Sequence, residues 1–104
     1  MMVKRCVGIL FLFFALSCNQ QTPAPLPIAN FYVDNAQCTS PCYLHFYDQS
    51  YSAVSWHWDF GNGITSTYQN DSTQYGSPGF YNVTLSVWNA DNVEDKITKQ
   101  VGVF

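Results

Sequence analysis

Along most of the chain after residue 28, hydrophobic and polar residues alternate with a period of two. The clearest runs span 54–60 and 81–88. In the first run the residues that share one face are Val54, Trp56, Trp58 and Phe60. In the second run they are Tyr81, Val83, Leu85 and Val87. Alternation of this kind is typical of antiparallel strands that bury one face and expose the other to solvent.

Three further segments, 31–33, 43–47 and 95–103, also predict strands. The strongest turn signal between strands is Gly61-Asn62-Gly63, where both glycines can adopt a positive φ. No segment shows helical spacing of useful length. Several short strands separated by turn clusters predict an all-β fold, an antiparallel β-sandwich.

Composition indicates one small domain that depends on aromatic packing. The chain has 104 residues, and 17% of them are aromatic. Large aromatic side chains compensate for the limited core of so short a chain. All seven acidic residues lie beyond residue 30, whereas only two of the four basic residues lie after Cys18, so that part carries 2 − 7 = −5 charges. Nucleic acid is therefore excluded as a partner, because two lysines cannot neutralise a run of phosphates.

Residues 1–17 have the pattern of a cleaved export signal. Lys4 and Arg5 precede an apolar stretch that is about half the ~20 residues needed to cross a bilayer. The segment Ala15-Leu16-Ser17-Cys18 resembles a bacterial lipobox, although Leu usually stands where Ala15 does. In a lipobox the cysteine becomes the acylated first residue of the mature protein. We therefore expect a lipid anchor on Cys18, with ordinary secretion as the alternative.

The segment 18–27 follows this signal and holds prolines at 23, 25 and 27. Prolines at every second position favour an extended, semi-rigid conformation. We expect a tether at 18–27 that joins the membrane anchor to a folded domain at 28–104.

Several motifs carry a resemblance to a known family. Residues 58–63 read WDFGNG, Tyr75 follows a dozen residues later, and 78–89 read PGFYNVTLSVWN. Together with Pro41 and the segment 46–50, they resemble the polycystic-kidney-disease (PKD) domain, whose patterns are W-D-F-G-D-G and P-G-x-Y-x-V-x-L-x-V-x-N. The resemblance covers about residues 28–103, and Asn62 replaces the usual Asp.

This resemblance implies an immunoglobulin-like sandwich of a kind found in many extracellular proteins. It places Trp58 in the position of the central core tryptophan. It also places Tyr81 where the hydroxyl of a tyrosine corner bonds back to the preceding loop.

The cysteines after the tether, Cys38 and Cys42, are expected to form a small structural disulfide. Pro41 favours a turn between them, and an exported protein meets oxidising conditions. A zinc site is the weaker alternative, because only His45 and His57 remain as further histidine or cysteine ligands. A redox pair normally stands at a helix start, and no helix is predicted here.

Two polar groups invite a chemical role. His57 and Asp59 share one strand face with Ser55, but a serine on a flat strand lacks the exposed elbow and oxyanion donors of a hydrolase. We therefore expect no enzyme. The acids Asp91, Glu94 and Asp95 crowd one turn, which leaves open whether calcium binds there or whether the turn needs them for its conformation.

Trp88 lies on the outward face of its strand and is expected to share a sheet face with His57 and Thr84. Exposed aromatic residues serve protein and sugar contacts, but a tryptophan covered by the leader or a loop is an equal alternative. Further exposed aromatics, whose register the sequence leaves open, are Tyr43, Tyr47, Tyr51 and Tyr68.

These features predict a non-catalytic lipoprotein of the cell envelope, at the outer membrane or cell surface, without cofactors. Its domain would bind an envelope or extracellular protein or a glycan, or act as a spacer. The alternative is an accessory protein that works with a separate exported protease or glycan-degrading enzyme.

Overall fold

A computed structural model describes residues 22–34 and 37–104, and in these ranges the chain forms eight strands and no helix. The strands are β1 (Phe31–Asp34), β2 (Gln37–Cys38), β3 (Cys42–Asp48), β4 (Ser55–Asp59), β5 (Thr65–Ser66), β6 (Asp71–Tyr75), β7 (Gly79–Trp88) and β8 (Glu94–Val103). No helix able to span a membrane is therefore found in the described ranges. The predicted export signal and the proposed lipid acceptor Cys18 lie outside them.

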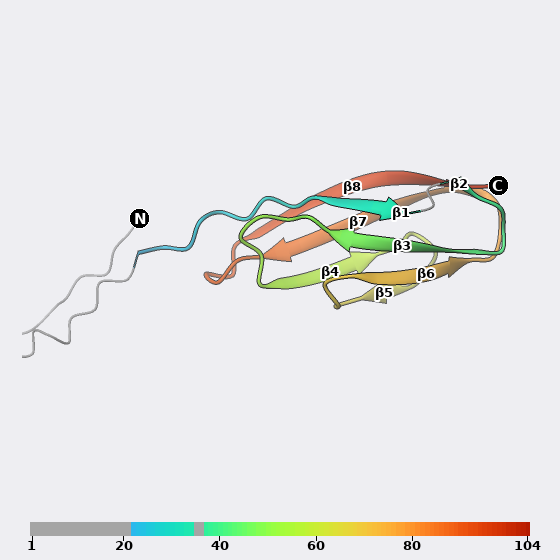
Figure 1. Ribbon diagram of the computed structural model, residues 1–104. Coiled ribbons are helices and arrows are strands. Elements are labelled where there is room, and N and C mark those ends of the chain that lie inside the picture. The colour runs from blue at the N-terminus through green and yellow to red at the C-terminus, as the bar shows by residue number, and fades with distance from the viewer. Residues whose placement is uncertain (1–21, 35–36) are drawn as a thin grey trace, which may run out of the picture.

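The strands form two sheets packed face to face (Figure 1). One sheet has the order β1-β3-β6, and the other has the order β2-β8-β7-β4-β5. All pairings are antiparallel except that of β2 with β8. The predicted all-β sandwich is confirmed.

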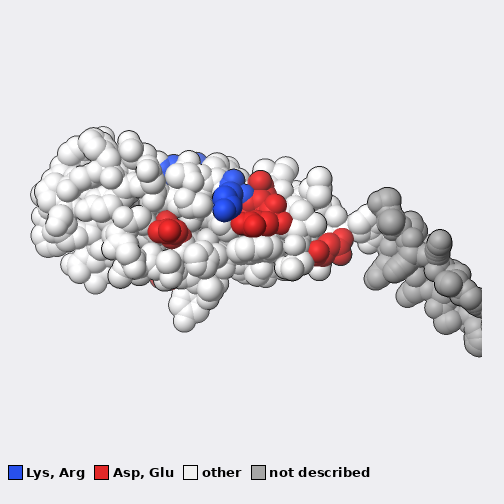
Figure 2. Space-filling view, turned by 180° about the vertical axis from the view of Figure 1, so that it is seen from behind, with Lys and Arg blue, Asp and Glu red and all other residues white. Residues whose placement is uncertain are grey.

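Charged side chains are sparse on the outside of the five-stranded sheet. In Figure 2 the acidic residues lie mostly toward the end of the domain that holds the β7–β8 turn, and the opposite end is almost free of charge. On this face the acidic charge is therefore concentrated toward the β7–β8 turn.

The core follows the predicted alternation on β7 and the end of β4. Val83, Leu85 and Val87 are fully buried, as are Trp58 and Phe60. The prediction is wrong for Val54, which is 59% exposed. Val54 precedes β4 at the end of the sandwich, where the opposite sheet does not cover its side chain.

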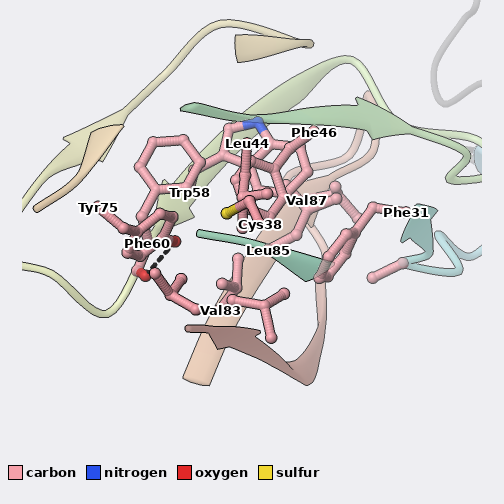
Figure 3. Packing of buried hydrophobic residues seen from close by; sticks show 13 residues of the cluster. Phe31, Cys38, Leu44, Phe46, Trp58, Phe60, Tyr75, Val83, Leu85 and Val87 are labelled. Carbon is pink, nitrogen blue, oxygen red and sulfur yellow. Dashed lines mark hydrogen bonds between the residues drawn. The ribbon is translucent and has the colours of Figure 1, made fainter. Parts of the chain in front are cut away.

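Four aromatic rings from three strands and the residue after β4 meet at the centre of the core (Figure 3). The ring of Trp58 lies 5.0 Å from Phe31, 5.6 Å from Phe46 and 5.8 Å from Phe60, measured between centroids. Phe31 and Phe46 belong to the three-stranded sheet, and Trp58 belongs to the five-stranded sheet. This cluster therefore joins the two sheets.

Two polar side-chain atoms of the core, the Trp58 indole nitrogen and the Tyr75 hydroxyl oxygen, find partners in loops. The Trp58 indole N–H donates to the carbonyl oxygens of Tyr68 and Gln69, at 3.0 and 3.3 Å. The Tyr75 hydroxyl donates to the Phe60 carbonyl at 2.7 Å, which is the dashed line in Figure 3. Burial of the Tyr75 hydroxyl raises its pKa above the ordinary range, and the charges of Tyr81 and Asp59 raise it further.

The predicted turn chemistry is confirmed at two places. The Tyr81 hydroxyl donates to the carbonyl of Ser77 at 2.7 Å, which closes the expected tyrosine corner. Gly61 has a φ of +79°, and a Cβ there would lie 2.5 Å from the backbone oxygen of Asn82. Only glycine fits at Gly61, because any side chain would meet both a strained backbone and a neighbouring strand.

Two charged residues of β8 point inward and close the open side of the sandwich next to β1. Lys99 donates through its ammonium group to the Phe31 carbonyl, and its Nζ lies 5.0 Å from the centroid of the Phe31 ring. The Asp95 carboxylate accepts the backbone N–H of Ala29 at 2.8 Å. Inward-pointing charges of this kind shield an edge strand from pairing with another chain.

Trp58→Ala is expected to lower the free energy of unfolding by about 3–5 kcal/mol, because it removes a fully buried ring and leaves a cavity. Tyr68→Ala is the matched control, since that aromatic side chain is 71% exposed. Urea denaturation of both variants beside the wild type measures the effect. Equal losses in the two variants would contradict the assigned core.

Tyr75→Phe is expected to cost about 1–3 kcal/mol, because it leaves the buried Phe60 carbonyl without its donor. It should also flatten the alkaline loss of stability. Above about pH 10 the Tyr75 hydroxyl ionises in the unfolded chain but keeps its proton in the native chain. The wild type therefore binds more protons when folded and loses stability as the pH rises. Urea melts between pH 8 and 11 test this, and equal pH slopes for wild type and variant would contradict it.

Candidate binding surfaces

The predicted grouping of Trp88, His57 and Thr84 on one sheet face agrees with the strand register. On the outer face of the five-stranded sheet, His57 lies opposite Ser86, and Thr84 lies between Asp59 and Thr98. Trp88, like His57 and Thr84, is half-buried, which lies between the exposed and the covered alternatives. This reduces the area that the indole ring offers to a partner.

Polar side chains on this face mostly pair across the strands. The hydroxyls of Thr84 and Thr98 lie 2.7 Å apart, and the Gln100 amide donates to Asn82 at 3.4 Å. Cross-strand pairs of this kind stabilise a sheet. The outer face of β7 and β8 thus carries two polar cross-strand pairs, Thr84 with Thr98 and Asn82 with Gln100.

The residues that suggested catalysis have structural partners. Asp59 accepts the backbone N–H of Gly61 at 3.0 Å and so holds the turn after β4. Within the described residues, His57 forms no hydrogen bond with Ser55 or Asp59. A nucleophile activated by an oriented base is therefore not assembled on β4.

Two acidic side chains in and beside the β7–β8 turn accept hydrogen bonds from the segment that leads into β1. They do not cluster around a cation. Asp91 accepts the N–H of Ala24 at 2.8 Å, as Asp95 does that of Ala29. Glu94 pairs instead with Lys96, at 3.7 Å. Within 22–34 and 37–104, no three His, Cys, Asp or Glu side chains lie close enough together to hold a metal ion.

The last residues of the predicted tether pack against the domain. The Pro25 carbonyl accepts the Ser52 hydroxyl and the Asn89 amide, both at 2.8 Å. Pro27 is buried. Packing therefore begins at Ala24 and not at the predicted boundary of residue 28.

The predicted disulfide between Cys38 and Cys42 is present, with 6.1 Å between the α-carbons. It closes the loop between β2 and β3. The neighbouring backbone is tied to the end of the chain, since Phe104 N–H donates to the Cys38 carbonyl and Ser40 N–H donates to the Phe104 carbonyl, both at 2.8 Å. No free cysteine is found in the described part of the chain.

The outer face of the three-stranded sheet carries a site that the sequence pattern did not single out. Tyr32 and Tyr47 stack there with centroids 5.0 Å apart and an angle of 22° between the rings. Beside Tyr47 lies a hollow of about 200 Å³, lined by His45, Phe46, Tyr47, Asn70, Asp71 and Ser72. The sequence could not reveal it, because β6 is polar and its partner strand was not predictable.

Known proteins resemble this chain over most of its described length. The family profile described as PKD domain matches residues 25–103. The PKD1 domain of Vibrio anguillarum Epp is 28% identical, with a TM-score of 0.68 over 78% of this chain and 96% of that one. The PKD1 domain of the Vibrio cholerae metalloprotease PrtV is 29% identical, with a TM-score of 0.67 over 76% and 98%.

A longer relative matches only in part. The microbial collagenase of Vibrio alginolyticus is 43% identical over 54 residues, which are 52% of this chain and 7% of that protein. The present chain therefore corresponds to a small fraction of this relative's length.

Proposed function

This chain belongs to the PKD domain family, and we propose that it is a non-catalytic lipoprotein of the cell envelope whose domain binds a protein or a glycan. The observation that carries the proposal is the location of the recognition groups. Aromatic and polar side chains able to contact a partner lie on the outer sheet faces, whereas apolar side chains fill the interior. A domain built in this way binds partners on the outer face of a sheet and does not enclose a reaction site.

Two further features support the location. The apolar segment before Cys18 and the adjacent lipobox-like residues support acylation and export. The Cys38–Cys42 disulfide supports folding in an oxidising compartment outside the cytoplasm. On this proposal the partners are the membrane, through the lipid anchor, and an envelope or extracellular protein or glycan.

An accessory role beside a separate exported enzyme is the second candidate. It is favoured by the match to part of a microbial collagenase and to the PKD1 domain of a metalloprotease. On this alternative the protein brings a substrate or a surface to a protease or glycan-degrading enzyme encoded elsewhere.

The anchor is tested by expressing the full chain in a bacterium with a lipoprotein-processing pathway. The wild type should partition into detergent and release a mature form whose acylated N-terminus is Cys18. Cys18→Ala should shift the protein to the unprocessed or soluble fraction. Mass spectrometry that finds an unmodified mature N-terminus at another residue would refute the anchor.

Partner binding is tested by affinity capture from envelope extracts. Loss of the Trp88 ring should weaken capture of a partner bound on the five-stranded sheet by more than about 1 kcal/mol. Trp88→Ala should destabilise the domain less than Trp58→Ala, because Trp88 is only half-buried. Tyr68→Ala is the control outside this face. Equal capture by wild type and Trp88→Ala would remove this face from the proposal.

A further inference from the structure

The hollow on the outer face of the three-stranded sheet has a defined construction. In the β3–β6 ladder, His45 lies opposite Ser72, and Phe46 lies opposite Asp71. The Phe46 side chain is fully buried on the other side of the sheet. Phe46 and its partner Asp71, which share the inner face, therefore contribute backbone to the floor of the hollow. The outward side chains of His45, Tyr47, Asn70 and Ser72 form its walls.

Tyr47 forms one wall and is held from behind. The strand order β1-β3-β6 places Tyr32 of β1 on one side of Tyr47 and the hollow on the other. Because Tyr32 stacks on Tyr47, the ring cannot turn freely toward β1. A supported aromatic ring next to a hollow offers contact area at a low entropic cost.

The opposite wall is also oriented by hydrogen bonds. The Asn70 side-chain oxygen accepts the backbone N–H of Asp48 at 2.8 Å. One Asp48 carboxylate oxygen accepts the Gln69 amide at 3.0 Å, and the other accepts the Ser50 N–H at 2.9 Å. The loop that carries Asn70 is thereby tied to the end of β3. Asn70 is exposed, and no hydrogen bond of its amide nitrogen to another described residue is present, so this donor is accessible to solvent or to a ligand.

The chemistry of the lining selects among ligands. Asn70 offers N–H donors, and the side chains of His45 and Ser72 can both donate and accept hydrogen bonds. An anion is disfavoured, because the strands β1, β3 and β6 contain no Lys or Arg. A cation would leave the amide donors unmatched. Hydroxyl groups match the lining best, because each is both a donor and an acceptor.

We propose that this hollow is a saccharide subsite, in which one neutral sugar ring of a glycan packs against Tyr47. The sugar hydroxyls then bond to His45, Asn70 and Ser72, and the apolar C–H face of the sugar covers the tyrosine ring. The hollow of about 200 Å³ lies below the ~300–1,000 Å³ of sites for drug-sized ligands, which fits one ring rather than several. This inference rests on the proposed binding function and names its ligand class.

Saccharide binding is tested with the full chain purified in a detergent that carries no sugar headgroup. Chito-, cello- and malto-oligosaccharides and muropeptides serve as probes in titration calorimetry. At least one should bind, and Tyr47→Ala should weaken its binding about tenfold, as expected for truncation of an aromatic anchor. Tyr47→Phe keeps the ring and should bind within about twofold of wild type.

Tyr43→Ala is the matched control, because Tyr43 lies on the same face of β3, is 55% exposed and does not line the hollow. Its affinity should equal that of the wild type. Amide NMR shifts on titration should centre on residues 45–47 and 70–72, a readout that needs no variant. Absence of binding to every probe would overturn the saccharide subsite, as would equal losses for Tyr43→Ala and Tyr47→Ala. A partner captured through Trp88 would still uphold the broader binding function.

Discussion

The structure depends on the burial of one tryptophan between two small sheets. Trp58 contacts Phe31 and Phe46 of the opposite sheet and stacks on Phe60 of its own chain segment. Its indole N–H bonds to the loop that leads into β6. The same side chain therefore joins the sheets through its apolar ring and orients the following loop through its polar atom. The ring pair of Tyr75 and Tyr81 and the hydrogen bond of Lys99 to the Phe31 carbonyl also span both sheets, and Trp58 lies in the core between these contacts.

The location of this core decides what remains on the outside. Once Trp58, Leu85 and Phe46 face inward, strict alternation sends His57, Thr84 and Tyr47 outward. The two outer faces then differ in character. On the five-stranded sheet the long β7–β8 ladder pairs polar groups with each other. On the three-stranded sheet the short pair β3–β6 ends at the loop that carries Asn70, and this loop is hydrogen-bonded to the end of β3. A hollow lies there beside the Tyr47 ring.

The acidic turn illustrates how packing assigns a role that composition leaves open. Asp91 and Asp95 could have formed a cation site by residue type alone. In the fold they accept backbone N–H groups of the entering segment, and Asn89 donates to it as well. Hydrogen bonds of backbone N–H groups to a carboxylate satisfy donors that proline-rich chain cannot pair in a sheet. The segment from Ala24 therefore belongs to the domain, and it is attached at the end that holds the β7–β8 turn.

The alternation of apolar residues at 54–60 and 81–88 was sufficient to predict two central strands, their inward faces and the sandwich, because burial of one face imposes a period of two on any such sheet. The turn at the glycines after Trp58 was equally predictable, since its conformational demand is local, and the tyrosine corner was implied by the family resemblance. The strands β5 and β6 were not predictable, because they are short and polar and form only through pairing with β4 and β3, respectively. The hollow beside Tyr47 depends on that pairing and on its register. Contacts between residues distant in sequence decided the partner strand, so only the tertiary structure could place Tyr47, Asn70 and Ser72 together.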